Sequence, residues 1–159
     1  MAIRVQQEDF DVGAEIAALT ANNPRIGGVT SFTGLVRDMA DGERTSAMTL
    51  EHYPGMTEKM LAEIDAEAHD RWPLEASLIV HRYGRLEAGD RIVLVIAASP
   101  HRDAAFDACR FLIDWLKTRA PFWKLEEAQD GSKRWVEAKE SDDDAAARWE
   151  PNDGKKKAG

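Results

Sequence analysis

Apolar residues recur along the chain with two periods, and each period predicts a different kind of element. Apolar side chains three or four residues apart predict helices, whereas alternating, β-branched or aromatic stretches predict strands. The predicted strands are 2–7, 26–37, 47–53, 76–84, 91–99 and a terminal hairpin of 122–128 with 133–138, and the predicted helices are 11–22, 54–72 and a long helix that starts within 99–106 and ends before residue 121. This order predicts an α+β fold with helices packed on a mainly antiparallel sheet.

Residue types with known positional preferences predict where the helices begin. Asp11 is the predicted N-cap of the first helix, because its side chain accepts a hydrogen bond from a free N–H group of the first turn. Ser99 is the predicted N-cap of the long helix, with Pro100 at its first position, where the missing N–H has no cost. The predicted apolar faces are Val12, Ile16 and Leu19 in the first helix, Met56, Met60, Ile64 and Ala68 in the second, and Phe106, Cys109, Ile113 and Leu116 in the third.

Polar and glycine-containing segments predict the connections and the tail. Residues 38–46 are predicted to form a loop, and 85–90 a turn between the two paired strands that flank it. A short helix is predicted around 145–149, and the end of the chain carries many polar residues and lysines. We therefore predict one domain over 1–150 and a disordered tail over 151–159.

The bulk composition excludes several classes of protein. Of the 159 residues, 43% are hydrophobic and 31% charged, as is usual for a globular protein. The longest apolar runs are too short to cross a bilayer, and the first ten residues lack the apolar segment of a secretory signal. The single cysteine, Cys109, excludes an internal disulfide. We predict a cytoplasmic protein with no membrane partner.

The charge is unevenly distributed. A formal net charge of −8 argues against nucleic acid as a partner, because nucleic-acid binding relies on basic surface. Within this acidic chain, residues 99–124 carry a small excess of basic side chains, whereas 125–150 carry a larger excess of acidic ones. The basic segment is typical of a site for a small anionic ligand, and chance clustering on a solvated face is the alternative interpretation.

The start of the long helix is the best candidate anion site. A helix N-terminus presents free N–H groups and a partial positive charge, and His101 and Arg102 add an imidazole and a guanidinium there. Arg37, which follows a predicted strand, is a further candidate. From the residues alone, the competing interpretation is that Arg102 pairs with a nearby acid and that His101 and Arg37 are ordinary surface residues.

Two lysines flank the end of the long helix. Lys117 follows His101 by sixteen residues, which is about 24 Å along a straight helix. One small ligand therefore reaches both only with help from a second subunit or a folded-back segment. Lys117 and Lys124 converge more readily, because Pro121 turns the chain between them. Lysines beside apolar side chains are usable acids, bases or nucleophiles; alternatively, the aromatic residues between them are core and both lysines extend to water.

Other reactive residue types suggest no metal or cofactor. The four histidines lack metal-ligand spacing, and no glycine-rich phosphate loop or nucleotide fingerprint occurs. Cys109 falls on the buried side of its helix, so we predict a core residue rather than a nucleophile. His52 and His81 are assigned to packing or interface roles. We therefore predict no metal site and no cofactor.

Six segments occur in an order and spacing that resemble one known family. They are "FTGLVRD" (32–38), "LEHYPGMTEKML" (50–61), "HRYGRLEAGD" (81–90), "SPHRDAAFDAC" (99–109), "LKTRAPFWK" (116–124) and "WVEA" (135–138). Together they resemble the catalytic large subunit of molybdopterin synthase, from about residue 5 to Trp149. A single segment of this kind is weak evidence, whereas six in register are specific.

The resemblance implies a fold, an assembly and a reaction. The implied fold is α+β of the α/β-hammerhead type, with two large subunits forming a central homodimer inside a heterotetramer. A small ubiquitin-like sulfur-carrier subunit binds at each end, and its C-terminal Gly-Gly tail enters a pocket as a thiocarboxylate. The implied activity is that of a sulfurtransferase of molybdenum cofactor biosynthesis, which converts cyclic pyranopterin monophosphate (precursor Z) into the dithiolene of molybdopterin.

The resemblance also assigns roles to residues. Lys117 is implied as the leading catalytic residue, with Lys124 assisting it, because the reaction needs proton transfers. The small phosphate ester suits the basic residues already singled out, and the family pocket takes residues from both protomers. The residues assigned to substrate binding are Leu35, Val36, Arg37, His101, Arg102, Lys117, Lys124, Leu125 and Glu126.

Two other functions compete with this hypothesis. A non-catalytic dimeric α+β module that binds a small phosphorylated metabolite keeps the basic cluster but needs no proton-transferring lysine. RNA binding through the basic helix is disfavoured by the net charge.

Overall fold

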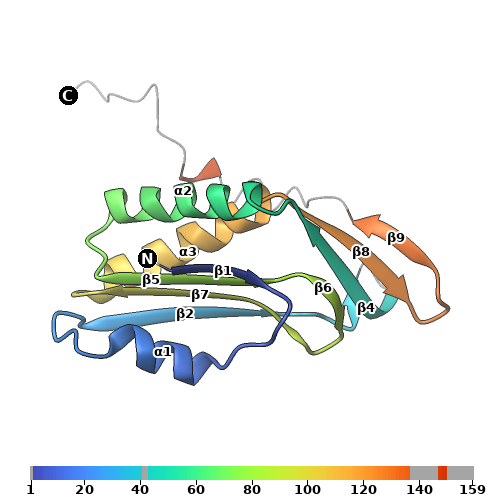
Figure 1. Ribbon diagram of the computed structural model, residues 1–159, viewed down its shortest axis with the longest axis horizontal. Coiled ribbons are helices and arrows are strands. Elements are labelled where there is room, and N and C mark those ends of the chain that lie inside the picture. Colours follow the sequence, from blue (N-terminus) through green and yellow to red (C-terminus); the bar gives the residue numbers. More distant parts are fainter. Residues whose placement is uncertain (1, 41–42, 137–146, 150–159) are drawn as a thin grey trace.

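The computed structural model describes residues 2–40, 43–136 and 147–149. The described residues form the predicted mixture of strands and helices, which confirms the α+β class (Figure 1). The strands are β1 (Ala2–Gln6), β2 (Gly28–Leu35), β3 (Met39–Ala40), β4 (Glu43–His52), β5 (Ala76–Arg82), β6 (Gly84–Glu87), β7 (Arg91–Ser99), β8 (Phe122–Ala128) and β9 (Lys133–Val136), and the helices are α1 (Val12–Thr20), α2 (Met56–Arg71) and α3 (Arg102–Thr118).

The first sheet has four strands in the order β1-β5-β7-β2. β1 runs parallel to β5, whereas β5–β7 and β7–β2 are antiparallel, so the predicted pairing of 76–84 with 91–99 is confirmed. Helix α1 packs on one face, and α2 with α3 on the other (Figure 1). Because helices cover both faces, β7 is a continuous apolar run rather than an alternating one.

Two apolar clusters lie on the two faces of this sheet. Under α1, the cluster combines alternate residues of β5 and β7 with the predicted face of α1, namely Phe10, Leu78, Val80, Leu94 and Ile96 with Val12, Ile16 and Leu19. On the other face, α2 and α3 pack against the alternate set, and this larger cluster also includes Met48, Leu50 and Leu86 from β4 and β6. The larger core therefore joins the first sheet to the second.

The second sheet is built around β4. β8 pairs with β4 along most of its length, β9 pairs with β8, and β3 and β6 also pair with β4. The predicted terminal hairpin is confirmed as β8–β9, and its turn contains Gly131 at a φ of 86°, a conformation that favours glycine. Figure 1 shows this sheet projecting from one end of the first sheet, where β8 follows α3.

Two predicted connections are wrong because each contains residues that pair as strands. The predicted loop 38–46 contains β3 and the start of β4, which pair with each other. The predicted turn 85–90 contains most of β6, which pairs with β4 and buries Leu86. The actual turn is shorter, with Gly89 at a φ of 91° and the Asp90 carboxylate accepting from the Glu87 N–H at 2.8 Å.

The long helix begins later than predicted. β7 extends through Ser99, which pairs with Gly28, so neither Ser99 nor Pro100 belongs to α3. The Ser99 hydroxyl instead donates to the Pro73 carbonyl at 2.9 Å. His101 is the N-cap residue, and its side chain makes no capping hydrogen bond. The N-cap prediction at Asp11 is confirmed, since its carboxylate accepts from the Ala14 N–H at 2.8 Å.

The predicted helix faces are only partly correct. Phe106 is 60% exposed, because it lies outside the face of α3 on which the alanines and several larger residues are buried. In α2, Met56 is 56% exposed and Ile64 and Ala68 are buried. The prediction that Cys109 belongs to the core is confirmed, and desolvation by burial raises the pKa of its thiol to about 12.

Some predictions fall on residues outside the described part of the chain. The disordered tail 151–159 lies there, as do residues 145 and 146 of the helix expected around 145–149. Residues 147–149 of that stretch are described, and the Trp149 indole N–H donates to the Asp114 carboxylate at 2.6 Å. This contact attaches the segment to α3.

Candidate active site

The two ends of the first sheet differ, because the connection between β7 and α3 lies at only one of them. At one end, Gly28 pairs with Ser99 and α3 begins. At the other end, β2 finishes beside Arg91, the first residue of β7. Because α3 returns along the sheet, Lys117 in its last turn lies at this second end. The candidate residues are therefore divided between two places.

Lys117 and Lys124 both lie near enough to His81, at the end of β5, to affect its pKa. The pKa of His81 is lowered to about 3, mainly by desolvation, and coulombic interactions with Lys117, Lys124 and His52 lower it further. These interactions act only over short separations in this environment. Residues from α3, β4, β5 and β8 therefore influence one buried imidazole, and the close approach of the two lysines to each other stays a prediction.

Two contacts fix the His81 ring. Its Nδ1 donates to the backbone carbonyl of Arg82 at 2.9 Å, and this bond opposes part of the pKa depression. Its face stacks on Phe122, with ring centroids 3.7 Å apart and an interplanar angle of 17°. The side chain is 8% exposed. The imidazole is therefore neutral and held in one orientation.

Strand pairing decides which β8 residues share the face of the lysine cluster. Phe122 pairs with His52, Lys124 with Leu50, and Glu126 with Met48. Because alternate residues of a strand lie on the same face, these three β8 side chains share the face of the sheet that carries the core. The ring of His52 also lies 4.3 Å from that of Tyr83. Glu126 is an ion-pair partner of Arg134 at 3.4 Å.

Leu125 lies on the opposite face of β8 from Lys124. It pairs with Trp135, and the neighbouring Trp123 packs edge-on against Tyr53 at 4.4 Å. The structure therefore places Lys124 and Glu126 together but separates Leu125 from them.

The end of β2 and the two residues after it bring three further candidates to the lysine end. The β2–β7 register shifts between Gly34 and Leu35, which leaves Leu35 53% exposed. Val36 is buried, and its backbone exchanges hydrogen bonds with Asp90 and Gly89 at 2.9 and 2.8 Å. Arg37 follows directly and is exposed. The buried Val36 thus anchors the two exposed candidates on either side of it.

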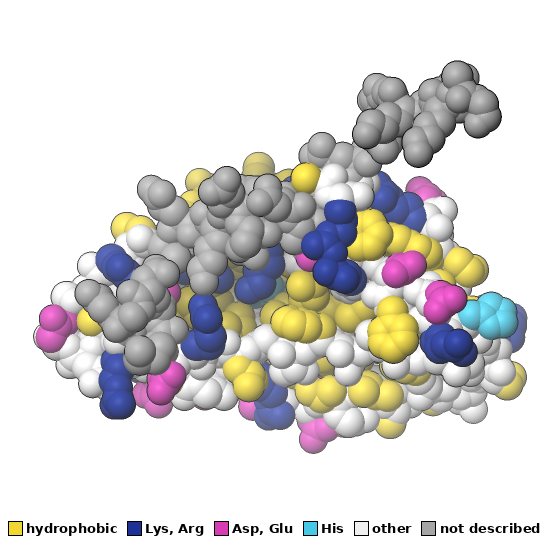
Figure 2. Space-filling model, turned by 180° about the vertical axis from the view of Figure 1, so that it is seen from behind, with side chains coloured by type: hydrophobic (Ala, Val, Ile, Leu, Met, Phe, Trp, Pro, Cys, Tyr) yellow, Lys and Arg dark blue, Asp and Glu magenta, His cyan; other side chains and the backbone are white. Residues whose placement is uncertain are grey.

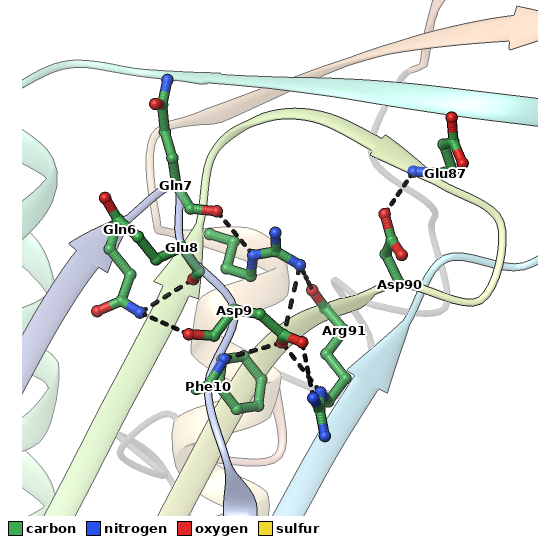
Figure 3. A network of polar contacts seen from close by, with 9 residues as sticks. Gln6, Gln7, Glu8, Asp9, Phe10, Glu87, Asp90 and Arg91 are labelled. Carbon is green, nitrogen blue, oxygen red and sulfur yellow. Dashed lines mark hydrogen bonds and ion pairs between the residues drawn. The ribbon is translucent and has the colours of Figure 1, made fainter.

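A polar network ties the strand ends together behind this site (Figure 3). Arg91 donates to both carboxylate oxygens of Asp9, at 3.0 and 2.6 Å. These bonds are the main reason that the pKa of Asp9 is lowered to about 2. The Arg82 guanidinium donates to the carbonyls of Gln7 and Arg91, each at 2.9 Å. The residue next to His81 therefore links the ends of β1, β5 and β7.

His101 and Arg102 lie together at the other end of the sheet, and both are exposed. Two glycines allow the close approach of β2 to this helix start. A Cβ on Gly27 would lie 2.1 Å from the Pro100 carbonyl oxygen, and one on Gly28 would lie 3.4 Å from the Arg102 Cα. Among the residues that the structure describes, the Arg102 side chain has no ion pair or hydrogen bond.

Exposed apolar side chains adjoin the basic ones. Figure 2, which views the molecule from behind, shows Lys and Arg side chains beside a broad area of hydrophobic ones. The large exposed hydrophobic residues on β2 and α3 are Val29, Phe32, Leu35 and Phe106. Within the described residues, no strand pairs with the outer edge of β2. This edge and its apolar side chains form a surface suited to a protein partner.

The described residues contain no group of three or more His, Cys, Asp or Glu side chains that could hold a metal ion. None of the described helices is long and apolar enough to span a membrane.

Sequence reasoning missed the central position of His81. Its signal was a histidine that ends an apolar strand, in the run "SLIVHR", directly before an arginine. A charged or polar residue that continues a buried strand is expected to have a specific partner. Which partner it has depends on β8 and α3, which follow much later in the chain.

The fold and the cationic cluster define a class: an α+β protein with two lysines at the end of its main sheet and a free strand edge beside them. The MoaE protein family model matches residues 5–119, and the chain belongs to this family. It is 60% identical over 150 residues to the molybdopterin synthase catalytic subunit of Pseudomonas aeruginosa, covering 94% of this chain and 99% of that protein.

Solved structures agree with this assignment. The molybdopterin biosynthesis MoaE protein from Burkholderia ambifaria superposes with a TM-score of 0.80 at 55% identity, covering 94% of this chain and 98% of that one. Molybdopterin synthase from Staphylococcus aureus superposes with a TM-score of 0.77 at 34% identity, covering 84% and 96%.

Proposed function

We propose that this protein is the catalytic subunit of molybdopterin synthase. It transfers sulfur from the thiocarboxylated C-terminus of a small ubiquitin-like subunit to cyclic pyranopterin monophosphate. The product carries the dithiolene of molybdopterin, so the protein acts as a sulfurtransferase in molybdenum cofactor biosynthesis. The nearness of Lys117 and Lys124 to His81 carries the proposal, together with membership of the family.

The two lysines suit the chemistry of this reaction. Opening the cyclic phosphate and adding sulfur both require protons to be moved, and a lysine within reach of the reacting atoms acts as an acid or base. Both the thiocarboxylate and the phosphate are anions, which ammonium groups attract. We assign Lys117 the leading catalytic role and Lys124 the assisting one. Because the partner supplies the sulfur, the buried Cys109 takes no part.

The remaining candidates are assigned by their places around this cluster. Leu35, Arg37 and Glu126 contact the substrate, since they lie at the lysine end or on the lysine face of β8. Val36 and Leu125 belong to the site as the residues that hold those strand segments in place.

A homodimer explains how the distant anion site contributes. If two copies pair antiparallel through the free edges of β2, the Gly28 end of one copy lies beside the Leu35 end of the other. His101 and Arg102 of the partner subunit then approach Arg37 and Lys117 of this chain. The exposed apolar residues of β2 and α3 support such an interface.

The assembly follows from these contacts. A small sulfur-carrier subunit with a C-terminal Gly-Gly thiocarboxylate binds at each lysine end, which gives a heterotetramer around the central homodimer. The relative's name, catalytic subunit, implies that it works with at least one further subunit. We assign the complex to the cytoplasm, where its small-molecule substrate would be made and used.

Reconstitution tests the proposal directly. The purified protein is mixed with precursor Z and a thiocarboxylated small subunit, and dithiolene product is measured. We expect product in proportion to the thiocarboxylate consumed. Binding of precursor Z without any product would instead favour a non-catalytic module for a phosphorylated metabolite.

Mixed dimers test the sharing of the site. A dimer of one Lys117→Ala protomer with one Arg102→Ala protomer has one site with both changes and one with neither, if sites are shared. We expect such mixed dimers to recover about half of the wild-type rate, although each homodimer is impaired. If the mixed dimers do not recover activity, the site is not shared between protomers. Lys117 and Arg102 then either act in the same protomer's site or do not act in a common site.

A further inference from the structure

Arg148 and Trp149 form a C-terminal strap that lies against α2 and α3, and the proposed reaction gives these residues no role. Figure 1 shows this short segment beside α2. Trp149 is half-buried and packs against the larger apolar core. Its ring lies edge-on to those of Trp72 and Phe111, with centroid separations of 5.5 and 5.7 Å. Edge-on aromatic pairs are favourable, so the Trp149 ring has a defined place.

Polar contacts connect the strap to both helices. The Trp149 indole N–H donates to the Asp114 carboxylate of α3 at 2.6 Å, and the Arg148 guanidinium lies 3.7 Å from the same carboxylate. The Trp149 carbonyl accepts from the guanidinium of Arg71, in the last turn of α2, at 2.6 Å. Asp114 is only 9% exposed, and a buried carboxylate is stable only with such partners. The strap therefore links the end of α2 to the C-terminal part of α3.

The same network continues beyond Lys117. The Arg71 guanidinium also binds the Glu67 carboxylate at 2.9 Å, and Glu67 lies 4.0 Å from the guanidinium of Arg119, the C-cap residue of α3. Asp114 precedes Lys117 by three residues, and Arg119 follows it by two. The last turn of α3 is therefore tied to α2 on both sides of the lysine.

The end of a helix needs such support more than its middle does. The last carbonyl groups of a helix lack intrahelical partners, and helix ends open locally at low free-energy cost. Lys117 lies in this last turn, and its side chain is exposed. A catalytic group must be held within about 0.5 Å of its working position. Contacts that fix the backbone at Lys117 therefore bear directly on the reaction.

We propose that Trp149 is a positioning residue: by binding Asp114 and Arg71, it holds the last turn of α3 against α2 and so fixes the backbone from which Lys117 reaches the substrate. The inference rests on the proposed function, in which Lys117 has the leading catalytic role. Trp149 acts through α3 rather than on the substrate.

Substitutions at Trp149 separate positioning from folding. Trp149→Ala removes both the ring and the N–H donor, whereas Trp149→Phe keeps a ring beside Trp72 and Phe111 but removes the donor. Ala147→Ser, at an exposed residue next to the strap, is the control. Reconstituted turnover is measured over a range of precursor Z concentrations, at a temperature at which circular dichroism shows every variant to be folded.

A positioning role predicts a loss in kcat rather than in KM. We expect Trp149→Ala to lower kcat by about 10- to 100-fold with KM for precursor Z within about twofold, because a misplaced catalytic group slows the chemical step. We expect Trp149→Phe to stay within about fivefold of wild type and Ala147→Ser to match it. A lower unfolding temperature for Trp149→Ala with a wild-type kcat would show that Trp149 only stabilises the fold, and would overturn the proposal.

A double substitution tests whether the effect passes through the hydrogen bond to α3. Asp114→Ala removes the acceptor, so Trp149→Phe should lower kcat no further in that background. Losses that simply multiply in the double variant would contradict the proposed route through Asp114.

Hydrogen exchange measures the support of α3 independently of turnover. We expect the amides of residues 115–119 to exchange about 10-fold faster in Trp149→Ala, with those of residues 104–108 unchanged. Unchanged exchange at 115–119 would overturn the proposal. If exchange changes as expected but the wild-type protein forms no dithiolene, the proposed function fails and the support of α3 by Trp149 stands.

Discussion

The two ends of helix α3 both carry basic side chains, but for different physical reasons. A helix has a partial negative charge at its C-terminus and a partial positive charge at its N-terminus. Lys117 in the last turn is therefore favourably placed, whereas Arg102 at the first position opposes the dipole. Lys117 and Arg102 are both exposed, but Lys117 lies near enough to the buried His81 to affect its pKa.

This difference separates the roles of the two ends. Lys117 belongs to a cluster that the chain completes by itself with His81, Lys124 and Phe122. Cations at a helix N-terminus are unfavourable without an anion, so His101 and Arg102 fit a place that a phosphate fills. The acidic Asp103 offsets part of the unfavourable charge in the first turn. We therefore propose that the C-terminal end supplies chemistry and the N-terminal end supplies affinity.

The largest effect is expected at the C-terminal end. Lys117→Ala removes the group assigned to proton transfer, and we expect dithiolene formation to fall by roughly 10²- to 10⁴-fold. Binding of the small subunit and the unfolding temperature should be nearly unchanged. Reconstituted turnover with saturating precursor Z measures the effect.

Lys133→Ala is the matched control for this change. Lys133 lies on β9 and is 4.0 Å from Glu127, on the face of the hairpin opposite Lys124. We expect this variant to retain the wild-type rate. Equal rates for Lys117→Ala and Lys133→Ala would remove the distinction between the two ends.

The second effect is expected at the N-terminal end and concerns binding. Arg102→Ala removes a charge-assisted contact to the phosphate, so we expect KM for precursor Z to rise by about 10- to 100-fold with a smaller change in kcat. Arg110→Ala, an exposed arginine further along α3, is the control. A loss confined to kcat would contradict the assignment of this end to affinity.

A third effect concerns the pH dependence of stability at the lysine end. The pKa of His81 is lowered to about 3 in the folded state, from 6.5 for an ordinary histidine. Between these values the unfolded chain binds more protons, so the unfolding free energy should fall as pH drops below 6.5. The contribution is at most about 1.4 kcal/mol per pH unit.

Urea unfolding of wild type and His81→Phe from pH 4 to pH 8 tests this effect, since phenylalanine does not titrate. We expect His81→Phe to lose the part of the change in unfolding free energy with pH that the titration of His81 causes. Lys117→Ala should raise the pKa of His81 in the folded state. The pH range over which the unfolding free energy falls should then end at a higher pH on its acidic side. Identical slopes for wild type and His81→Phe would show that the imidazole is not buried in a cationic environment.

The smallest effect is expected in the network behind the site. Asp9→Asn breaks the ion pair with Arg91, whose closest contact is 2.6 Å. Because Asp9 is half exposed, we expect a loss of only about 0.5 kcal/mol of unfolding free energy at pH 7. The pKa of Asp9 is lowered to about 2, so this stability is present above pH 3.8 and disappears as pH falls through 2.

Unfolding of Asp9→Asn at pH 7 and near pH 2 measures this contribution. Glu8→Gln, a neighbouring acidic residue, serves as the control. A difference from wild type that persists at the lower pH would show that the loss comes from packing rather than from charge.

Local pattern predicted most elements and one whole helix face. Asp11 caps α1 as expected, and Val12, Ile16 and Leu19 pack where their spacing places them. These features depend on residues within one or two helical turns of each other. Prediction failed at Ser99, because its strand partner Gly28 lies far away in sequence and extends β7 through it.

The candidate site was predicted as a set of residue types but not as an arrangement. The length of α3 separates His101 from Lys117 as expected, whereas the approach of Lys117 to Lys124 across the bend at Pro121 stays a prediction. The sequence did not indicate that His81 would be their common neighbour. It also did not indicate that β-strand pairing would turn Leu125 away from Lys124.

The sequence by itself determined the α+β class, most helix and strand positions, the buried Cys109 and the segments by which the family is recognised, since these follow from local spacing and residue type. The tertiary structure alone decided that α3 returns along the sheet, that β6 and β3 join β4, and that Lys117 and Lys124 both affect the pKa of the buried His81. Those outcomes depend on contacts between residues far apart in the chain, and such contacts form only when strands pair and cores close.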